Sequence, residues 1–131
     1  MKEKRSVTVL TDISLITCIV GQDNADRITK AAIDAGVQGA TVHYARGTGL
    51  RERLGILGFA AEVEKEVINI VVPSDQANRI FEIMYLAGEL DKPGRGFMYI
   101  TELDKAATFI PPRIREKLAR EDESEKNLYQ M

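Results

Sequence analysis

The chain of 131 residues carries 18 Lys and Arg against 20 Asp and Glu, which gives a formal net charge of −2. Hydrophobic residues make up 44% and charged residues 29%, a composition that excludes wholesale disorder and, with its acidic balance, argues against binding along nucleic acid. A single cysteine, Cys18, and a single histidine, His43, exclude a disulfide scaffold, a cysteine-based zinc cluster and a multi-histidine metal site within one chain.

The first half of the chain predicts a strand, a helix and a second strand. Residues 15–20 are β-branched and almost wholly apolar, which is typical of a buried strand. A helix follows, with Asp23 or Asn24 as its N-cap and Gly36 as its C-terminal stop. Its apolar face has helical spacing and consists of Ile28, Ala31, Ala32 and Ala35. Residues 41–46 then predict a second strand.

The second half of the chain also predicts a strand, a helix and a strand. Residues 67–72 predict a strand that Pro73 ends, and Ser74 or Asp75 is expected to cap the helix that follows. One side of this helix is apolar or small, formed by Ala77, Ile80, Phe81, Met84 and Gly88. A turn-rich stretch leads into a last strand at residues 97–101.

The predicted order is β-α-β-β-α-β, the split arrangement of ferredoxin-like α+β domains. We expect a four-stranded antiparallel sheet with two helices on one face, in a domain of residues 15–110. Residues 1–14 would form an N-terminal extension and residues 111–131 a charged C-terminal tail. The strands are too apolar for the second face of the sheet to meet water, so self-association is expected. No run approaches the length of a membrane span, and a cytoplasmic protein is expected.

Two glycine-containing segments are candidates for anion binding. Gly47-Thr48-Gly49 follows a predicted strand, and Gly94-Arg95-Gly96 precedes another. Glycines let backbone N–H groups approach an anion closely, so two such segments at one end of a sheet would suit a phosphate chain. Ordinary turns would explain the same glycines. The connection at residues 47–65 is also far longer than a hairpin turn, and loops of that length are usually functional or disordered.

The stretch Ala-Gly-Val-Gln-Gly-Ala-Thr-Val at residues 35–42, followed by Arg46-Gly47-Thr48-Gly49, resembles the PII family of nitrogen-regulatory signalling proteins. The resemblance continues through Lys65, the strand at residues 68–73 and Gly94-Arg95-Gly96-Phe97, and it covers about residues 15–110. It implies a ferredoxin-like homotrimer that binds adenine nucleotides in clefts between subunits. It also implies that residues 47–65 form the T-loop, which docks on a membrane transporter or a metabolic enzyme.

The resemblance assigns the nucleotide site residue by residue. Val71 would lie against the base, and Lys65 would contact ligand at the base of the T-loop. One side of the nucleotide site would be lined by Thr41, Gly47, Thr48 and Gly49. The phosphates would be held from the other side by Gly94, Arg95 and Gly96.

The chain departs from the family pattern at several positions. Leu50-Arg51 stands where members that sense 2-oxoglutarate carry Arg-Gln, which puts oxoglutarate and magnesium binding in doubt. The T-loop contains no tyrosine, so the uridylylation switch is absent. Thr108-Phe109-Ile110 replaces an arginine pair that meets the terminal phosphates, and the loop from Gly88 to Gly94 is longer than usual. These losses favour ADP or AMP over MgATP.

The T-loop is apolar for an exposed loop, which leaves two interpretations open. One is a partner-docking surface, for which the candidate residues are Leu50, Arg51, Arg53, Leu54 and Phe59. The other is that the apolar side chains of this loop, including Ile56 and Leu57, pack onto the protein's own trimer.

A regulatory binding module is therefore the expected function, with no catalytic residue, metal site or prosthetic group. The alternatives are a CutA-like trimer with a structural or metal-related role and a small-anion sensor that has lost nucleotide binding. An RNA-binding domain of the same topology would need aromatic residues on the central strands, which lack them. An acylphosphatase-like hydrolase would need an arginine cradle that the sequence does not contain. Cys18 is expected to be an inert core thiol, and His43 a packed or surface residue.

Overall fold

The computed structural model describes residues 5–47, 63–114 and 116 of the chain. These residues fall into two compact units. The larger unit is Thr11–Asp104, and the smaller unit combines Met1–Leu10 with Lys105–Met131. The larger unit contains every described residue that the sequence assigned to a functional site.

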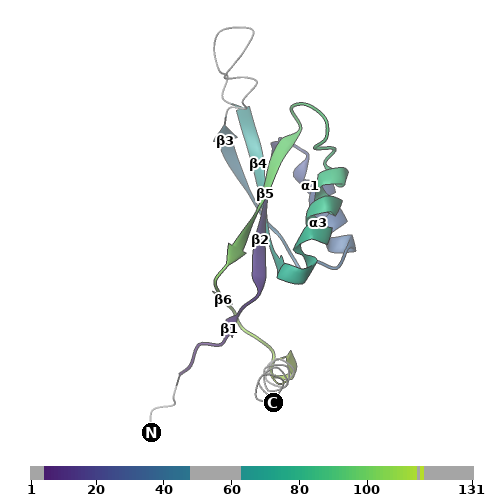
Figure 1. The fold of residues 1–131 in the computed structure, drawn as a ribbon. Helices are drawn as coiled ribbons and strands as arrows, with labels where there is room; N and C mark the ends of the chain where they lie inside the picture. The colour runs from purple at the N-terminus through teal and green to yellow at the C-terminus, as the bar shows by residue number, and fades with distance from the viewer. Residues whose placement is uncertain (1–4, 48–62, 115, 117–131) are drawn as a thin grey trace. The chain divides into compact units, whose positions relative to one another are not determined.

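The larger unit is a four-stranded antiparallel sheet with two helices on one face (Figure 1). The strand order is β3-β4-β2-β5. The strands are β2 (Ile13–Gly21), β3 (Thr41–Gly47), β4 (Val63–Pro73) and β5 (Gly96–Leu103). The helices are α1 (Ala25–Asp34) and α3 (Ser74–Ala87). The predicted ferredoxin-like α+β fold is confirmed.

The core lies between the helices and the sheet, and alternation along the strands builds it. In β2, Ile16, Cys18 and Val20 point to the helices and are fully or almost fully buried. The same layer contains Ile68, Ile70 and Val72 of β4, Ala25, Ile28 and Ala32 of α1, and Ala77, Ile80 and Met84 of α3. Burial of each large aliphatic side chain contributes about 1.5–3 kcal/mol. Desolvation raises the pKa of the Cys18 thiol to about 12, so Cys18 is a neutral core residue.

Helix α1 begins at a predicted N-cap residue and helix α3 does not, and neither helix is capped by a predicted side chain. Asn24 occupies the N-cap position of α1, but its side chain makes no capping hydrogen bond. Pro73, rather than Ser74 or Asp75, is the N-cap residue of α3. The Ser74 hydroxyl instead hydrogen-bonds that of Ser14 at 2.9 Å, which joins the start of α3 to β2. The sequence pattern thus predicted the position of each helix correctly, but the side chains that it named as caps make no capping hydrogen bond.

The hairpin of β3 and β4 continues further than the sequence indicated. The ladder extends to the pair Gly47↔Val63, so residues 63–65 belong to β4 and Gly47 to β3. Residues 64–66 are all charged, which is why the sequence did not predict a strand there. In the ladder Arg46 is opposite Glu64, and opposite charges favour such a cross-strand pair. The rest of the predicted T-loop, residues 48–62, lies outside the described residues.

The smaller unit contains a two-stranded antiparallel sheet. Strand β1 (Val9–Leu10) pairs with β6 (Ala106–Ala107), with Val9 opposite Ala107 and Leu10 opposite Ala106. Strands of two residues carry too little periodicity to be recognised in a sequence.

Candidate functional site

The face of the sheet opposite the helices, here called the open face, carries exposed apolar side chains. Val71 is 50% exposed, Phe97 64% and Tyr99 41%. The rings of Phe97 and Tyr99 contact each other with their centroids 5.8 Å apart. Large contiguous apolar patches on a protein surface usually mark a contact with another molecule. The open face therefore has the character of an interface.

A polar pair lies at the centre of the open face. Thr17 of β2 and Asn69 of β4 are opposite each other in the ladder, and the Thr17 hydroxyl donates to Asn69 Oδ1 at 2.9 Å. Thr17 is only 4% exposed. The Thr17 hydroxyl and Asn69 Oδ1 satisfy each other, so a chain that covers this pair needs to supply an acceptor only for the Asn69 amide N–H groups.

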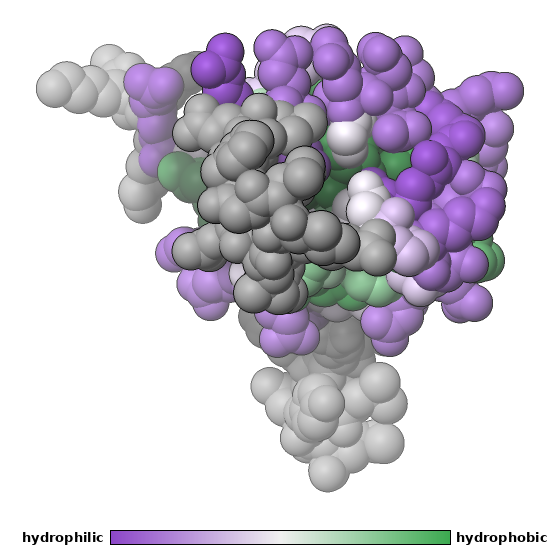
Figure 2. Space-filling model, turned by 90° about the horizontal axis from the view of Figure 1, so that it is seen from above, coloured by the Kyte–Doolittle hydropathy of each residue, from purple (hydrophilic) through white to green (hydrophobic). Residues whose placement is uncertain are grey.

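The loop end of the sheet is the end at which β3 finishes and β4 and β5 begin. Gly47, Lys65 and Gly96 all lie there. In the ladders Lys65 is opposite both Ala45 and Gly21, and Gly96 is opposite Val20. Seen from above, most of the described surface is hydrophilic, with smaller hydrophobic areas (Figure 2). Of the three residues at the loop end, only Lys65 carries a charge.

Within one chain, however, the two glycine segments are not neighbours. Gly47 ends edge strand β3 and Gly96 begins the opposite edge strand β5, with β4 and β2 between them. At a spacing of roughly 4.8 Å per strand, three spacings place these two backbones about 14 Å apart. The expectation of a cradle closed by both segments is therefore not met inside a single chain.

The close packing of Gly96 against β2 fixes the second glycine segment. The φ angle of Gly96 is +156°, and a Cβ atom there would lie 2.6 Å from the carbonyl oxygen of Ile19. No other residue fits this position without displacing the backbone of the central strand. Gly94 has a φ of +76° but open space around it. The segment is thus held by packing at one glycine and by backbone conformation at the other.

Arg95 lies between these glycines and is engaged by the acidic residue Glu89. Its Nη2 donates to Glu89 Oε2 at 2.5 Å, and Lys92 Nζ donates to Glu89 Oε1 at 3.0 Å. Arg95 Nε is buried and has no partner among the described residues. The hydrogen bond and charge of Lys92, followed by the charges of Arg95 and Arg27, lower the pKa of Glu89. The i, i+3 spacing of Glu89 and Lys92 was the available sequence signal.

The remaining described site residues lie along β3 and β4. Thr41 begins β3, six residues or about 20 Å from Gly47 at the strand rise. Thr41 is opposite Asn69 in the ladder, which places it beside Val71 on the open face. Thr41 and Val71 are therefore brought together, while Gly47 and Lys65 form a separate group at the loop end. Seven predicted residues lie outside the described part of the chain: Thr48, Gly49, Leu50, Arg51, Arg53, Leu54 and Phe59.

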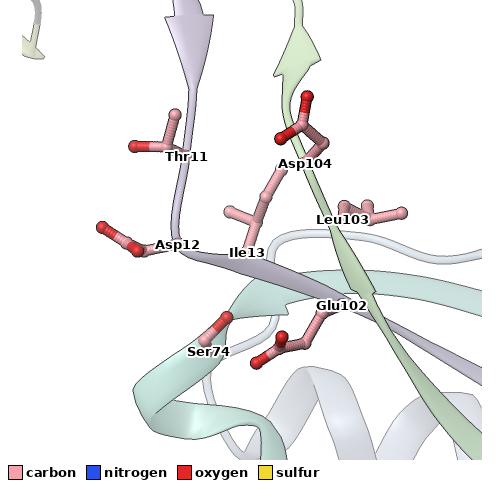
Figure 3. A pocket seen from close by; sticks show the side chains of 7 residues that line it. All are labelled: Thr11, Asp12, Ile13, Ser74, Glu102, Leu103 and Asp104. Carbon is pink, nitrogen blue, oxygen red and sulfur yellow. The ribbon is translucent and has the colours of Figure 1, made fainter.

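A pocket of about 440 Å³ lies at the other end of the sheet, away from Gly47, Lys65 and Gly96 (Figure 3). It is lined by Thr11, Asp12, Ile13, Ser74, Glu102, Leu103 and Asp104. Three of these side chains are carboxylates and none is a cation, so the pocket disfavours a phosphate. In the part of the chain that the structure describes, no cluster of His, Cys, Asp or Glu is arranged to hold a metal ion. No helix there is long and apolar enough to cross a membrane.

Comparison with known proteins agrees with this geometry. The sequence profile described as nitrogen regulatory protein P-II matches residues 13–111. No curated protein sequence matches the chain significantly. Among solved structures, the crystal structure of Arabidopsis thaliana PII bound to citrate matches with a TM-score of 0.58 at 20% identity, over 72% of this chain and 79% of that one. At this identity the structural likeness shows the fold alone.

The family match runs from the start of β2 past the end of β5 and so includes the whole sheet, both helices and both glycine segments. Proteins of this family are trimeric, non-enzymatic regulators of partner proteins. From the extent of this match, together with the ferredoxin-like fold, we conclude that the chain belongs to the PII family of nitrogen regulatory proteins.

Proposed function

We propose that this protein is a homotrimer that binds an adenine nucleotide in the clefts between its subunits and regulates a partner through the segment after Gly47. The observation that carries the proposal is the placement of the two glycine segments on opposite edges of one sheet. A ligand held by both segments needs the β3 edge of one subunit and the β5 edge of another.

The open face supports the trimer. Val71, Phe97 and Tyr99 present apolar surface that water solvates poorly, and the Thr17 hydroxyl already donates to Asn69 Oδ1. Burial of apolar surface contributes roughly 25 cal/mol per Å². Packing of the open faces against one another would remove this surface from water in all three copies.

The cations near the glycine segments support a phosphate-containing ligand. Arg95 belongs to the second glycine segment, while Lys65 and Arg46 lie at the loop end near Gly47. A charge-assisted hydrogen bond contributes about 1.5–3 kcal/mol. Because Thr108-Phe109-Ile110 supplies no cation for a terminal phosphate, we propose ADP or AMP rather than MgATP as the ligand. Val71 would contact the base, and Thr41 beside it the rest of the nucleoside.

We further propose that Leu50, Arg51, Arg53, Leu54 and Phe59 form the docking surface for a transporter or a metabolic enzyme in the cytoplasm. Nucleotide contacts at Gly47, Thr48 and Gly49 would favour one conformation of the segment over another. A ligand can shift such an equilibrium only by its difference in affinity for the two conformations.

The test is isothermal titration of the purified protein with AMP, ADP, ATP with magnesium, and 2-oxoglutarate, together with a mass measurement in solution. We expect a trimer that binds ADP or AMP, with affinity lost in Arg95→Ala and retained in the control Arg113→Ala, which removes an exposed arginine of the smaller unit. A trimer that binds none of these ligands would contradict nucleotide binding and leave a sensor of a different small anion. Equal binding of MgATP would contradict the preference for ADP or AMP.

A further inference from the structure

The Glu89 carboxylate holds both cations of the loop that leads into the second glycine segment. Its Oε2 accepts from Arg95 Nη2 at 2.5 Å, and its Oε1 accepts from Lys92 Nζ at 3.0 Å. One carboxylate oxygen thus accepts from a guanidinium and the other from an ammonium. A phosphate group presents oxygens to such a pair of cations in the same manner.

The backbone holds Glu89 at this position. Its φ angle is +54°, a conformation that is uncommon for a residue with a long side chain. The N–H of Glu89 donates to Leu86 O at 3.1 Å, and the N–H of Lys92 donates to Glu89 O at 3.0 Å. The side chain itself remains 41% exposed. The main chain therefore fixes the position of the Glu89 Cα and Cβ atoms, while the exposed side chain can rotate its carboxylate towards solvent.

The hydrogen bonding of Arg95 is incomplete while Glu89 holds it. Glu89 reaches Nη2 alone, and Nε is buried without a partner among the described residues. A guanidinium bound through Nε and Nη2 makes the two parallel hydrogen bonds that carboxylates and phosphates favour. A ligand oxyanion that engages both nitrogens would therefore gain a hydrogen bond that Glu89 does not make.

We propose that Glu89 is an internal counter-anion, which a phosphate group of the ligand must displace from Arg95 and Lys92 in order to bind. The identity of that phosphate as part of a nucleotide rests on the proposed function, whereas the displacement itself does not. Glu89 lowers the affinity for phosphate and keeps Arg95 paired in the ligand-free protein. It thereby determines which anions bind, because a ligand that cannot engage Nε gains nothing over Glu89.

The experiment compares the unaltered protein with Glu89→Gln and with the matched control Asp91→Asn. Both variants remove one negative charge from the same loop, but Asp91 pairs with no cation among the described residues. Glutamine keeps the length of the side chain and the same backbone cost at φ +54°. Affinity is measured by isothermal titration with ADP and separately with inorganic pyrophosphate, which has no base or sugar. The amide NMR signals of Gly94 and Gly96 report binding at the second glycine segment.

We expect Glu89→Gln to bind both probes about 2- to 5-fold more tightly, the range that exposed ion pairs support. Asp91→Asn should change the affinity by less than about 1.5-fold at physiological salt. Weaker binding in Glu89→Gln would overturn the proposal, because Glu89 would then be a residue that positions Arg95 for the ligand. Equal changes in the two variants would also overturn it, since charge alone would explain them.

The two probes separate this inference from the proposed function. If pyrophosphate shifts the signals of Gly94 and Gly96 and Glu89→Gln tightens its binding while ADP does not bind, the counter-anion is supported and nucleotide binding is contradicted. If neither probe binds any of the three proteins, there is no phosphate for Glu89 to exclude, and the inference fails with the site.

Discussion

Glu66 Oε1 accepts a hydrogen bond from the backbone N–H of Asn24 at 3.1 Å, and so a carboxylate of strand β4 caps helix α1. The N–H of Ala25 lies 3.5 Å from the same oxygen. Glu66 is 6% exposed, and its negative charge lies where the helix dipole favours it. A residue 42 positions away in the chain thus does what the local candidates Asp23 and Asn24 do not.

Replacement of Glu66 should destabilise the protein. Glu66→Ala leaves the Ala25 N–H without its acceptor and the Asn24 N–H with Gly21 O alone, and loss of a cap costs about 1–2 kcal/mol. Glu66→Gln keeps an acceptor oxygen and should cost less. Urea unfolding measures both, with Glu64→Ala, an exposed glutamate of the same strand, as the control. An equal loss in Glu64→Ala would assign the effect to strand β4 in general rather than to the cap.

The two glycines of the second segment should differ in their tolerance of alanine. Gly96→Ala places a Cβ atom 2.6 Å from Ile19 O in addition to the cost of a positive φ, whereas Gly94→Ala meets no atom within 4 Å. We expect Gly94→Ala to cost about 1–2 kcal/mol and Gly96→Ala clearly more. Thermal unfolding of the two variants decides this, and the reverse order would show that β5 does not pack on β2 as described.

A charge on the open face should prevent self-association. Phe97→Glu places a carboxylate in the apolar patch beside Tyr99, and desolvation of an unpaired charge is strongly unfavourable. We expect the mass measured by light scattering to fall from that of the oligomer to that of one chain. Leu86→Glu, on the helix side of the molecule, should leave the mass unchanged. An intact oligomer in Phe97→Glu would exclude the open face as the interface.

The contribution of Glu89 to stability should depend on pH. Since Lys92 and Arg95 hold the pKa of Glu89 below its usual value of 4.5, the ion pairs stabilise the fold above that pH. The contribution is lost as the pH falls through the lowered value, because the carboxylate then takes up a proton. The difference in melting temperature between the unaltered protein and Glu89→Gln should be constant from pH 8 to about 6 and should shrink below about 4.5. A difference that grows on acidification would contradict this assignment.

Cys18 should be unreactive in the folded protein. It is fully buried in β2, and burial raises the pKa of its thiol to about 12, so almost no thiolate exists at pH 8. A disulfide reagent such as 5,5′-dithiobis(2-nitrobenzoate) should label it only as fast as the domain opens. Because it is the only cysteine in the chain, the signal comes from one site. Immediate labelling without denaturant would contradict its burial.

The sequence was sufficient for features that depend on local composition and spacing. The apolar, β-branched run at residues 15–20 predicted strand β2, and the helical spacing of Ile28 and Ala32 predicted the buried face of α1. The positive φ of Gly36, at +109°, confirms the predicted end of that helix.

Features that join distant segments were not predictable in the same way. The cap from Glu66 needs β4 to lie beside the start of α1, although its place in the same alternation as Ile68 and Ile70 was a usable signal. The ion pair between Glu89 and Arg95 depends on the conformation of an irregular loop. The separation of Gly47 from Gly96 follows from the strand order, which periodicity does not contain.

Strand β2 pairs with β4 on one side and with β5 on the other, so the first long strand of the chain lies inside the sheet. The β2–β5 ladder, in which Ile16 is opposite Ile100, can form only after β5 has been synthesised. At a synthesis rate of about 5–20 residues per second, the chain needs about 4–16 s to add the residues between β2 and the end of β5. During that time an apolar strand edge remains open to pairing with other chains. Production of the protein is therefore expected to be sensitive to translation speed and to chaperones that shield nascent strands.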